Sequence, residues 1–266
     1  MPLKAKSETT VTACVLIIGN EILSGRTQDR NLAFLGQRLN DLGIRLMEAR
    51  VVPDVEAVIV ATLNEVRRRF DYVLTTGGIG PTHDDITADC VAKAFGRPLI
   101  VHPEARAILE AHYPPGELTD ARLRMARTPE GAELIENPVS KAPGFQVENV
   151  FVMAGIPDIM QAMFASLQHR LAGGQPLRSR TVAVELGESF VADGLARLQE
   201  RFPDVEIGSY PFNRAGVFGT RLVLRATEED LLDAAAGELD ALLTGLGARA
   251  TWETAAVTEK MDEVTR

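Results

Sequence analysis

Hydrophobic and polar positions follow a repeating order over the first two thirds of the chain. Short continuous apolar runs, such as residues 12–18 (TACVLII), predict buried strands. Between these runs, apolar residues recur every three or four positions, as over residues 31–42, and predict helices with one buried side. This alternation predicts an α/β fold, a three-layer αβα arrangement around a sheet of parallel type. The expected strands are residues 12–18, 44–52, 71–76, 132–136 and 147–153, and the expected helices are 31–42, 55–70, 84–95, 104–112, 119–126 and 158–171.

The last third of the chain has a different pattern. Residues 172–179 (AGGQPLRS) are typical of a linker. Beyond them we expect a small α+β unit with strands at 180–186, 205–209 and 220–227 and helices at 191–201 and 228–246. The sequence therefore predicts two domains, residues 1–172 and 178–250, followed by a frayed tail over residues 251–266.

Composition limits the classes of function. A formal net charge of −9 argues against a general binder of nucleic acids or of anionic membranes. The only two cysteines, Cys14 and Cys90, lie in apolar segments and are predicted to be buried hydrophobic residues rather than a disulfide. No apolar run is long enough to cross a bilayer, and the first residues lack the apolar core of a signal peptide. We therefore expect a cytoplasmic protein that does not bind membranes.

The segment TTGGIGPTHDDIT, residues 75–87, follows the third expected strand and carries the strongest candidate chemistry. In folds of this kind, ligands bind beyond the carboxyl ends of the strands. Thr76, Gly77, Gly78 and Gly80 are candidates for a cradle whose backbone amides bind a phosphate, next to the N-terminus of the following helix. The alternative is a tight turn between strand and helix that binds no ligand.

Two adjacent aspartates in this segment favour the ligand-binding alternative. One aspartate is explained as a helix cap. A second one suggests that Asp84 and Asp85 bind Mg²⁺ or another divalent cation, because such cations prefer oxygen ligands shared between carboxylates and phosphates. The cation would offset the repulsion between carboxylate and phosphate and polarise the phosphoryl group.

Two other loops after expected strands add polar candidates. Asn20, Glu21 and Ser24 follow the first strand, and Glu21 is either a contact to metal or ligand or a cap for the next element. Asp54 follows the second strand and fits the N-cap of the helix that begins at residue 55.

Two Pro- and Gly-containing turns give weaker signals. Pro143 and Gly144 belong to NPVSKAPGF, residues 137–145, and Gly155 belongs to MAGIPDIM, residues 153–160. Each turn is by itself typical of ordinary loop chemistry.

Taken together, the motifs resemble a known family. GNEILSG, VVPD, TTGGIGPTHDDIT, NPVSKAPGF and AGIPDIM occur in this order within residues 19–160. The series resembles the molybdopterin-binding domain of the MoaB/Mog proteins, most closely the N-terminal region of the competence/damage-inducible protein A (CinA) branch. The resemblance covers residues 11–171, and the second unit is similar to the KH-like middle domain of that branch. The C-terminal deamidase domain of full-length CinA proteins has no counterpart in this sequence, so nicotinamide-nucleotide deamidation is not implied.

The resemblance implies candidate activities and site residues. The first is a divalent-metal-dependent nucleotide pyrophosphatase that hydrolyses ADP-ribose- or FAD-like dinucleotides, and the alternative is molybdopterin binding and adenylylation with Mg²⁺. A third possibility is a nucleotide- or pterin-binding protein without catalysis. Catalytic roles are implied for Asp85, Asp54 and Glu21, with metal contacts from Asp84 and Asp85. The implied ligand-binding residues are Thr76, Gly77, Gly78, Gly80, Asn20, Ser24, Pro143, Gly144 and Gly155.

The resemblance also bears on partners. Asn20 stands where full-length members often have aspartate, which weakens the case for metal binding at that position. The expected partner is a small nucleotide or pterin, and relatives suggest a homo-oligomer. RNA binding is not expected, since the KH-like unit lacks a GXXG-type loop and the chain is acidic.

Overall fold

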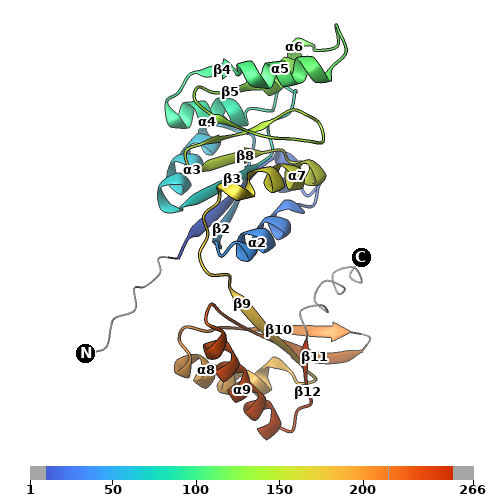
Figure 1. The fold of residues 1–266 in the computed structure, drawn as a ribbon. Coiled ribbons are helices and arrows are strands. Elements are labelled where there is room, and N and C mark those ends of the chain that lie inside the picture. The colour runs from blue at the N-terminus through green and yellow to red at the C-terminus, as the bar shows by residue number, and fades with distance from the viewer. Residues whose placement is uncertain (1–9, 215, 254–266) are drawn as a thin grey trace, which may run out of the picture. The chain divides into compact units, whose positions relative to one another are not determined.

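The computed structural model describes residues 10–214 and 216–253, and the chain forms two compact units, residues 1–175 and 176–266 (Figure 1). Each unit has its own sheet and its own hydrophobic core. The candidate chemistry of the sequence lies in the first unit.

The first unit is built on a six-stranded sheet with the order β2-β1-β3-β8-β7-β6. The first four strands in this order run parallel to one another, while β7 and β6 are antiparallel to their neighbours. The strands are β1 (Thr12–Ile18), β2 (Arg45–Val52), β3 (Tyr72–Thr76), β6 (Glu133–Ile135), β7 (Gly144–Val147) and β8 (Val150–Met153). The predicted α/β fold with a mostly parallel sheet is confirmed.

Helices cover both faces of this sheet, as Figure 1 shows for α3 and α4 on one side and α2 and α7 on the other. Alternate side chains of β1 pack into the two cores: Cys14, Leu16 and Ile18 enter one, and their neighbours enter the other. Burial on both faces explains the unbroken apolar run of this strand, because each fully buried aliphatic side chain contributes roughly 1.5–3 kcal/mol. The helices are α2 (Asn31–Asp41), α3 (Glu56–Arg69), α4 (Thr87–Phe95) and α7 (Pro157–Leu167).

Shorter elements complete the first unit. β4 and β5 form an antiparallel pair that the sequence pattern did not predict. Ala105 and Leu109 of α5 pack with Ala126 of η1 in a small separate core. These elements are α1 (Asn20–Leu23), β4 (Leu99–Val101), α5 (Pro103–His112), α6 (Asp120–Leu123), η1 (Arg124–Ala126), β5 (Arg127–Pro129) and η2 (Gln168–Arg170).

The expected single strand over residues 147–153 is wrong. The segment turns back at Glu148, whose φ of 52° is positive, so β7 and β8 form an antiparallel hairpin in which Val147 pairs with Val150. Two polar residues, Glu148 and Asn149, interrupt the apolar run and form the turn. Because β7 is antiparallel to β8, the segment before β7 is carried to the carboxyl end of β8.

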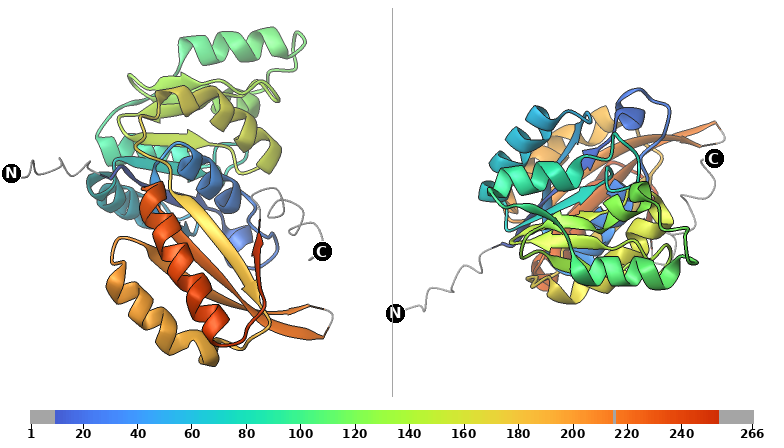
Figure 2. Two further views of the ribbon diagram at one scale, coloured as in Figure 1. Left: turned by 60° about the horizontal axis from the view of Figure 1, so that its bottom comes forward. Right: turned by 90° about the horizontal axis from the view of Figure 1, so that it is seen from above.

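The second unit is a four-stranded antiparallel sheet with two helices on one face (Figure 2). Val182, Val184, Leu222 and Leu224 point from alternate strand positions into the core beneath the helices. The predicted small α+β unit is therefore present. Its strand order is β10-β11-β9-β12, and its elements are β9 (Arg178–Val184), α8 (Glu188–Arg201), β10 (Glu206–Arg214), β11 (Val217–Ala226), α9 (Glu229–Gly245) and β12 (Ala250–Glu253).

The expectation of a frayed tail from residue 251 is wrong for its first residues. β12 pairs with β9 in register Ala250 to Val184, and the Trp252 indole donates a hydrogen bond to Asp240 at 3.0 Å. Edge pairing and this hydrogen bond hold the segment in the sheet. Residues 254–266 of the expected tail lie outside the described residues.

No helix in the described ranges combines the length and the apolar character that a membrane span requires.

The two cysteines behave as the sequence predicted. Cys14 and Cys90 are free, fully buried thiols in the same core. Burial is the main reason that the pKa of Cys14 rises to about 11 and that of Cys90 to about 12. Both thiols are therefore protonated at neutral pH and shielded from reagents.

We expect neither thiol of the native protein to react with Ellman's reagent at about pH 8, because thiolate is the reactive form and both groups are buried. The chain unfolded in guanidinium chloride is the control and should release two equivalents of the coloured product, one for each cysteine. Rapid labelling of the native protein would contradict the buried placement.

Candidate functional site

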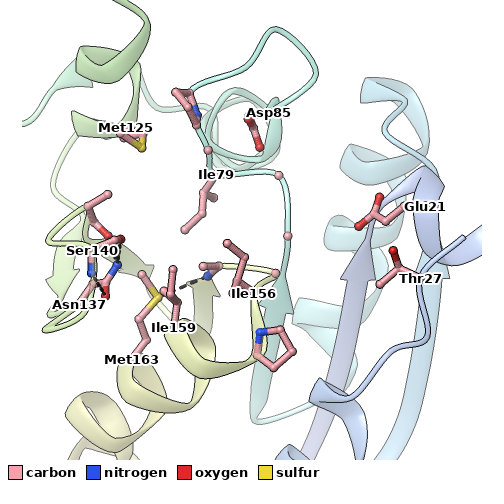
Figure 3. A pocket seen from close by; sticks show the side chains of 18 residues that line it. Glu21, Thr27, Ile79, Asp85, Met125, Asn137, Ser140, Ile156, Ile159 and Met163 are labelled. Carbon is pink, nitrogen blue, oxygen red and sulfur yellow. Dashed lines mark hydrogen bonds between the residues drawn. The ribbon is translucent and has the colours of Figure 1, made fainter. Parts of the chain in front are cut away.

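A cavity of about 510 Å³ lies at the carboxyl ends of the parallel strands (Figure 3). Segments that follow β1, β3 and β8 line it, together with the segment before β7. Asn137 and Ser140 lie on one side and Glu21 and Thr27 on the other, with Ile79 and Ile156 between them. The lining residues are Glu21, Thr27, Gly77, Gly78, Ile79, Gly80, Pro81, Asp85, Met125, Asn137, Ser140, Ala142, Ala154, Gly155, Ile156, Pro157, Ile159 and Met163.

The loop after β3 requires glycine at two positions. Gly77 and Gly78 have φ angles of 102° and 67°, which side chains rarely adopt. A Cβ atom at Gly77 would lie 2.1 Å from the carbonyl oxygen of Ile18, and one at Gly78 would lie 2.2 Å from Thr87 Oγ1. The glycines therefore allow this loop to pack directly against β1 and the start of α4.

Hydrogen bonds divide the glycine loop into a structural and a free part. The N–H of Gly77 donates to Met153 O at 3.1 Å, and Thr87 donates from Oγ1 to Gly77 O at 3.0 Å and from its N–H to Gly78 O at 3.0 Å. Gly77 thus joins β3 to β8, and its amide is not available to a ligand as the sequence suggested. The N–H groups of residues 78–80, by contrast, donate to no other residue among those described. They are the candidate anion cradle.

Asp85 lies against this cradle and does not cap a helix. Its Oδ2 accepts hydrogen bonds from the Thr82 N–H at 2.8 Å and from the Thr82 hydroxyl. This bonding closes a turn before α4, so the helix begins at Thr87 and not at residue 84 as expected. A Cβ atom at Gly80 would lie 2.7 Å from Asp85 Oδ2, which shows how closely the carboxylate packs on the loop.

Asp84 does not line the cavity. Its side chain is 64% exposed. The nearby Thr82 hydroxyl is the main cause that lowers the pKa of Asp84 from its ordinary value, so this group is a carboxylate at neutral pH. Of the two adjacent aspartates, only Asp85 is placed to act on a ligand in the cavity.

The loop after β1 contributes one carboxylate. Glu21 lines the cavity, with its carboxylate folded back over Gly19. Ser24 donates from Oγ to Glu21 O at 3.2 Å, and Asn20 is exposed, so these two residues shape the loop and do not line the cavity.

Asp54 supports this first loop. Its Oδ2 accepts the N–H of Asn20 at 2.8 Å. The sequence suggested Asp54 as N-cap of α3, but the N-cap is Val55 and has no capping side-chain hydrogen bond. Asp54 lies outside the cavity lining, so its observed role is to position the segment that carries Glu21.

Buried polar groups lie beneath the two loops. Thr76 is 1% exposed, and its hydroxyl has no partner among the described residues. Asn31 donates from Nδ2 to Gly155 O at 2.8 Å, and its buried Oδ1 also lacks a partner within the described ranges. Gly155 itself lines the cavity and packs on Gly77. Thr76 therefore supports the loop from below and does not touch the cavity.

The segment before β7 contributes residues that the sequence reading missed. Asn137 accepts the N–H groups of Val139 and Ser140, each at 3.1 Å, and donates to Ser140 Oγ at 2.6 Å and to Ala142 O at 2.8 Å. Asn137 and Ser140 line the cavity. An asparagine at the start of a Pro-containing turn is the signal that could have indicated Asn137, because such side chains bond their own backbone. The predicted Pro143 and Gly144 do not line this cavity.

One side of the cavity is apolar. Its hydrophobic residues come from the glycine loop, from η1 and from the start of α7. Such a surface suits a flat ring of adenine, flavin or pterin type. The sequence pattern could not identify these residues as cavity lining, because tertiary packing determines which side chains face the cavity. They are Ile79, Met125, Ile156, Ile159 and Met163.

The acidic side chains at the cavity fit a cation only together with a ligand. In the part of the chain that the structure describes, no three His, Cys, Asp or Glu side chains gather at one point. The carboxylates that line the cavity are Glu21 and Asp85. Mg²⁺ is commonly held by one or two carboxylates and by the phosphates of a substrate. This donor set is compatible with such a shared cation.

Comparison with known families finds a match for each unit. Residues 14–173 match the family described as a probable molybdopterin binding domain. The chain belongs to the molybdopterin-binding domain family. Residues 176–248 match the middle domain of FAD synthase.

Individual relatives place this member of the family near CinA. A CinA-like protein of Salinibacter ruber (strain DSM 13855 / M31) is 33% identical over 93% of this chain and 59% of its own length. A probable FAD synthase of Caenorhabditis elegans is 31% identical over 88% of this chain and 50% of its own length. The crystal structure of the protein CinA from Thermoplasma acidophilum is 36% identical, with a TM-score of 0.57 over 60% of this chain and 96% of that chain. The chain thus spans 59% of the CinA-like relative and 50% of the FAD synthase relative.

The close packing at Gly77 gives a stability test. Gly77→Ala should lower the free energy of unfolding by about 1–3 kcal/mol, because a methyl group meets Ile18 O and φ is positive. Gly36→Ala is the matched control. It lies within α2, where a Cβ has room, and should raise this free energy by roughly 0.5–1 kcal/mol. Urea unfolding of both variants measures the difference, and equal stability of the two would contradict the described geometry.

Proposed function

We propose that this member of the molybdopterin-binding domain family is a divalent-metal-dependent nucleotide pyrophosphatase that acts on ADP-ribose- or FAD-like dinucleotides. One observation carries the proposal: free backbone N–H groups, a carboxylate and an apolar wall face the same cavity of about 510 Å³. These features match the three parts of such a substrate, namely phosphates, the cation that accompanies them, and a ring. The name of the FAD synthase relative supports a nucleotide substrate.

In this proposal each residue has a role that follows from its position in the cavity. The N–H groups of residues 78–80 bind non-bridging oxygens of the pyrophosphate, as free amides in a glycine turn do for anions. Asp85, with the ligand's phosphates, holds the divalent cation, which supplies charge neutralisation when bound. Glu21 orients a water and accepts a proton from it as the water oxygen bonds to phosphorus, while the bridging oxygen leaves with the second phosphate. AMP and the phosphorylated remainder are the products.

Two residues have roles that differ from those implied by family resemblance. Asp54 positions the first loop, and with it Glu21, by accepting the Asn20 N–H. Asp84 stays in solvent and contributes charge near the site without touching the ligand. The cation contact is assigned to Asp85 alone.

The activity test uses purified protein with ADP-ribose, FAD and NAD as separate substrates. We expect AMP from at least one of them when Mg²⁺ or Co²⁺ is present, because the cation is shared between Asp85 and the phosphates. EDTA should abolish AMP release, and an excess of Mg²⁺ should restore it. Absence of AMP under all these conditions, in protein with a normal melting temperature, would refute the pyrophosphatase proposal.

The family description favours a second candidate, the binding of molybdopterin, to which the sequence resemblance adds its adenylylation. The same cradle, cation and apolar wall would then take the pterin and its phosphate. Transfer of AMP from ATP to molybdopterin, without release of AMP from dinucleotides, would support this candidate. Binding of either ligand without turnover would support a non-catalytic protein. A homo-oligomer and a cytoplasmic location stay predictions.

The two adjacent aspartates allow a sharp mutational test. Asp85→Asn should lower kcat by roughly 100-fold or more, because it removes the carboxylate that faces the cavity. Asp84→Asn changes the same charge one residue earlier and should retain most of the activity, because that side chain is exposed. Steady-state AMP release measures both variants. Full turnover by Asp85→Asn, or equal losses in the two variants, would refute the assignment.

A further inference from the structure

A small niche adjoins the main cavity behind the glycine loop. It shares Gly78, Ile79, Gly80, Asp85 and Met125 with the cavity lining. Its volume is about 10 Å³, which is room for a single oxygen atom or water molecule. The other residues that line it are Ala88, Arg124, Arg127, Pro143 and Phe145.

Two arginines line this niche, and only one has an ionic partner. Arg127 donates from Nη2 to Asp89 Oδ2 at 3.1 Å. Arg124 forms no side-chain hydrogen bond and no ion pair with any residue in ranges 10–214 and 216–253. The Nε atoms of both arginines are buried and lack a hydrogen-bond acceptor there.

A buried guanidinium nitrogen without an acceptor is unfavourable. Buried polar groups are nearly always paired, and leaving one unpaired destabilises the protein, more so when the group is charged. An acceptor from outside the chain would remove this cost. The niche has room for one such acceptor atom.

The balance of donors and acceptors indicates an anionic oxygen. Arg124 and the N–H groups of residues 78–80 are donors without partners in the described chain. Asp85 is the acidic residue of the niche, and its Oδ2 already accepts two hydrogen bonds from Thr82. Arg127, the other charged residue of the lining, pairs with Asp89. The rest of the lining is apolar and lowers the local dielectric, which strengthens an interaction between guanidinium and anion.

We propose that Arg124 binds a non-bridging phosphoryl oxygen of the ligand, with that oxygen in the niche and the rest of the ligand in the main cavity. This proposal rests on the proposed function in one respect, namely that the ligand is a phosphate or pyrophosphate ester. It assigns a phosphate-binding residue to η1, a segment outside every motif singled out in the sequence. Arg124 then selects phosphorylated ligands over the corresponding unphosphorylated ring compounds.

The test compares Arg124→Gln with Arg122→Gln by calorimetric titration of the full chain with inorganic pyrophosphate, AMP and adenosine. We expect Arg124→Gln to weaken pyrophosphate and AMP binding at least tenfold and to leave adenosine binding unchanged. Arg122 is the matched control, because it lies on the neighbouring α6 and pairs with Glu117 at 3.4 Å outside the niche. The pyrophosphate affinity of Arg124→Lys should lie between those of the wild type and Arg124→Gln, because lysine keeps the positive charge but lacks the planar guanidinium with its paired N–H donors.

If folded Arg124→Gln binds pyrophosphate with an affinity within twofold of the wild type, the proposal is overturned. The niche would then be a site for a water molecule. A measurement on the unmodified protein covers the case that the variants do not fold. Phenylglyoxal should label Arg124, and pyrophosphate should protect it while Arg122 remains labelled. No labelling, or labelling that pyrophosphate does not reduce, would equally overturn the proposal.

The outcomes separate this proposal from the proposed activity. If dinucleotides are not hydrolysed but pyrophosphate binding depends on Arg124, the phosphate subsite stands and the pyrophosphatase assignment fails. If dinucleotides are hydrolysed but pyrophosphate binding does not depend on Arg124, the pyrophosphatase assignment stands and the phosphate subsite fails.

Discussion

The candidate site depends on how closely the backbone at Gly77 approaches the ends of two neighbouring strands. The Gly77 N–H reaches Met153 O at the end of β8, and the Cα faces Ile18 O at the end of β1. The space on this side of Gly77 admits no Cβ atom. This residue holds the loop in place, and residues 78–80, whose N–H groups donate to no other described residue, line the cavity.

The charges around this backbone arrangement are balanced in an unusual way for an acidic chain. Asp85 lies on the glycine loop, while Arg124 and Arg127 line its far side. A negative carboxylate, neutral donors and positive guanidinium groups thus surround a small volume. This combination of charges suits a phosphate with a bound metal ion, because such a group presents both negative and positive charge. It would also allow a protein of net charge −9 to hold the proposed phosphate ligand without a general basic surface.

Much of the fold could be predicted because burial imposes a period on the sequence. The run at residues 12–18 is buried on both faces, and the helices repeat their apolar residues every three or four positions. The turn at Glu148 was missed, because β7 and β8 are short apolar runs separated by two polar residues. The start of α4 was placed too early, because Asp85 closes a turn instead of capping a helix. Propensity cannot distinguish these two uses of aspartate.

The sequence indicated the glycine loop that lines the cavity, but it did not show that the Gly77 amide is used within the fold. Residues selected by tertiary packing, such as Met125 and Arg124 on η1, carry no local signal of their own.

The cavity wall combines residues as distant as Glu21 and Met163 in the sequence. No single helix or hairpin of the first unit contains enough of this wall to bind a ligand. Binding of the proposed ligand would therefore require the completed sheet, so that only the native unit would bind it. By mass action, a ligand present at 100 times its Kd stabilises that unit by about 2.7 kcal/mol. The cellular concentration of the proposed ligand would then help to determine the folded fraction of the protein.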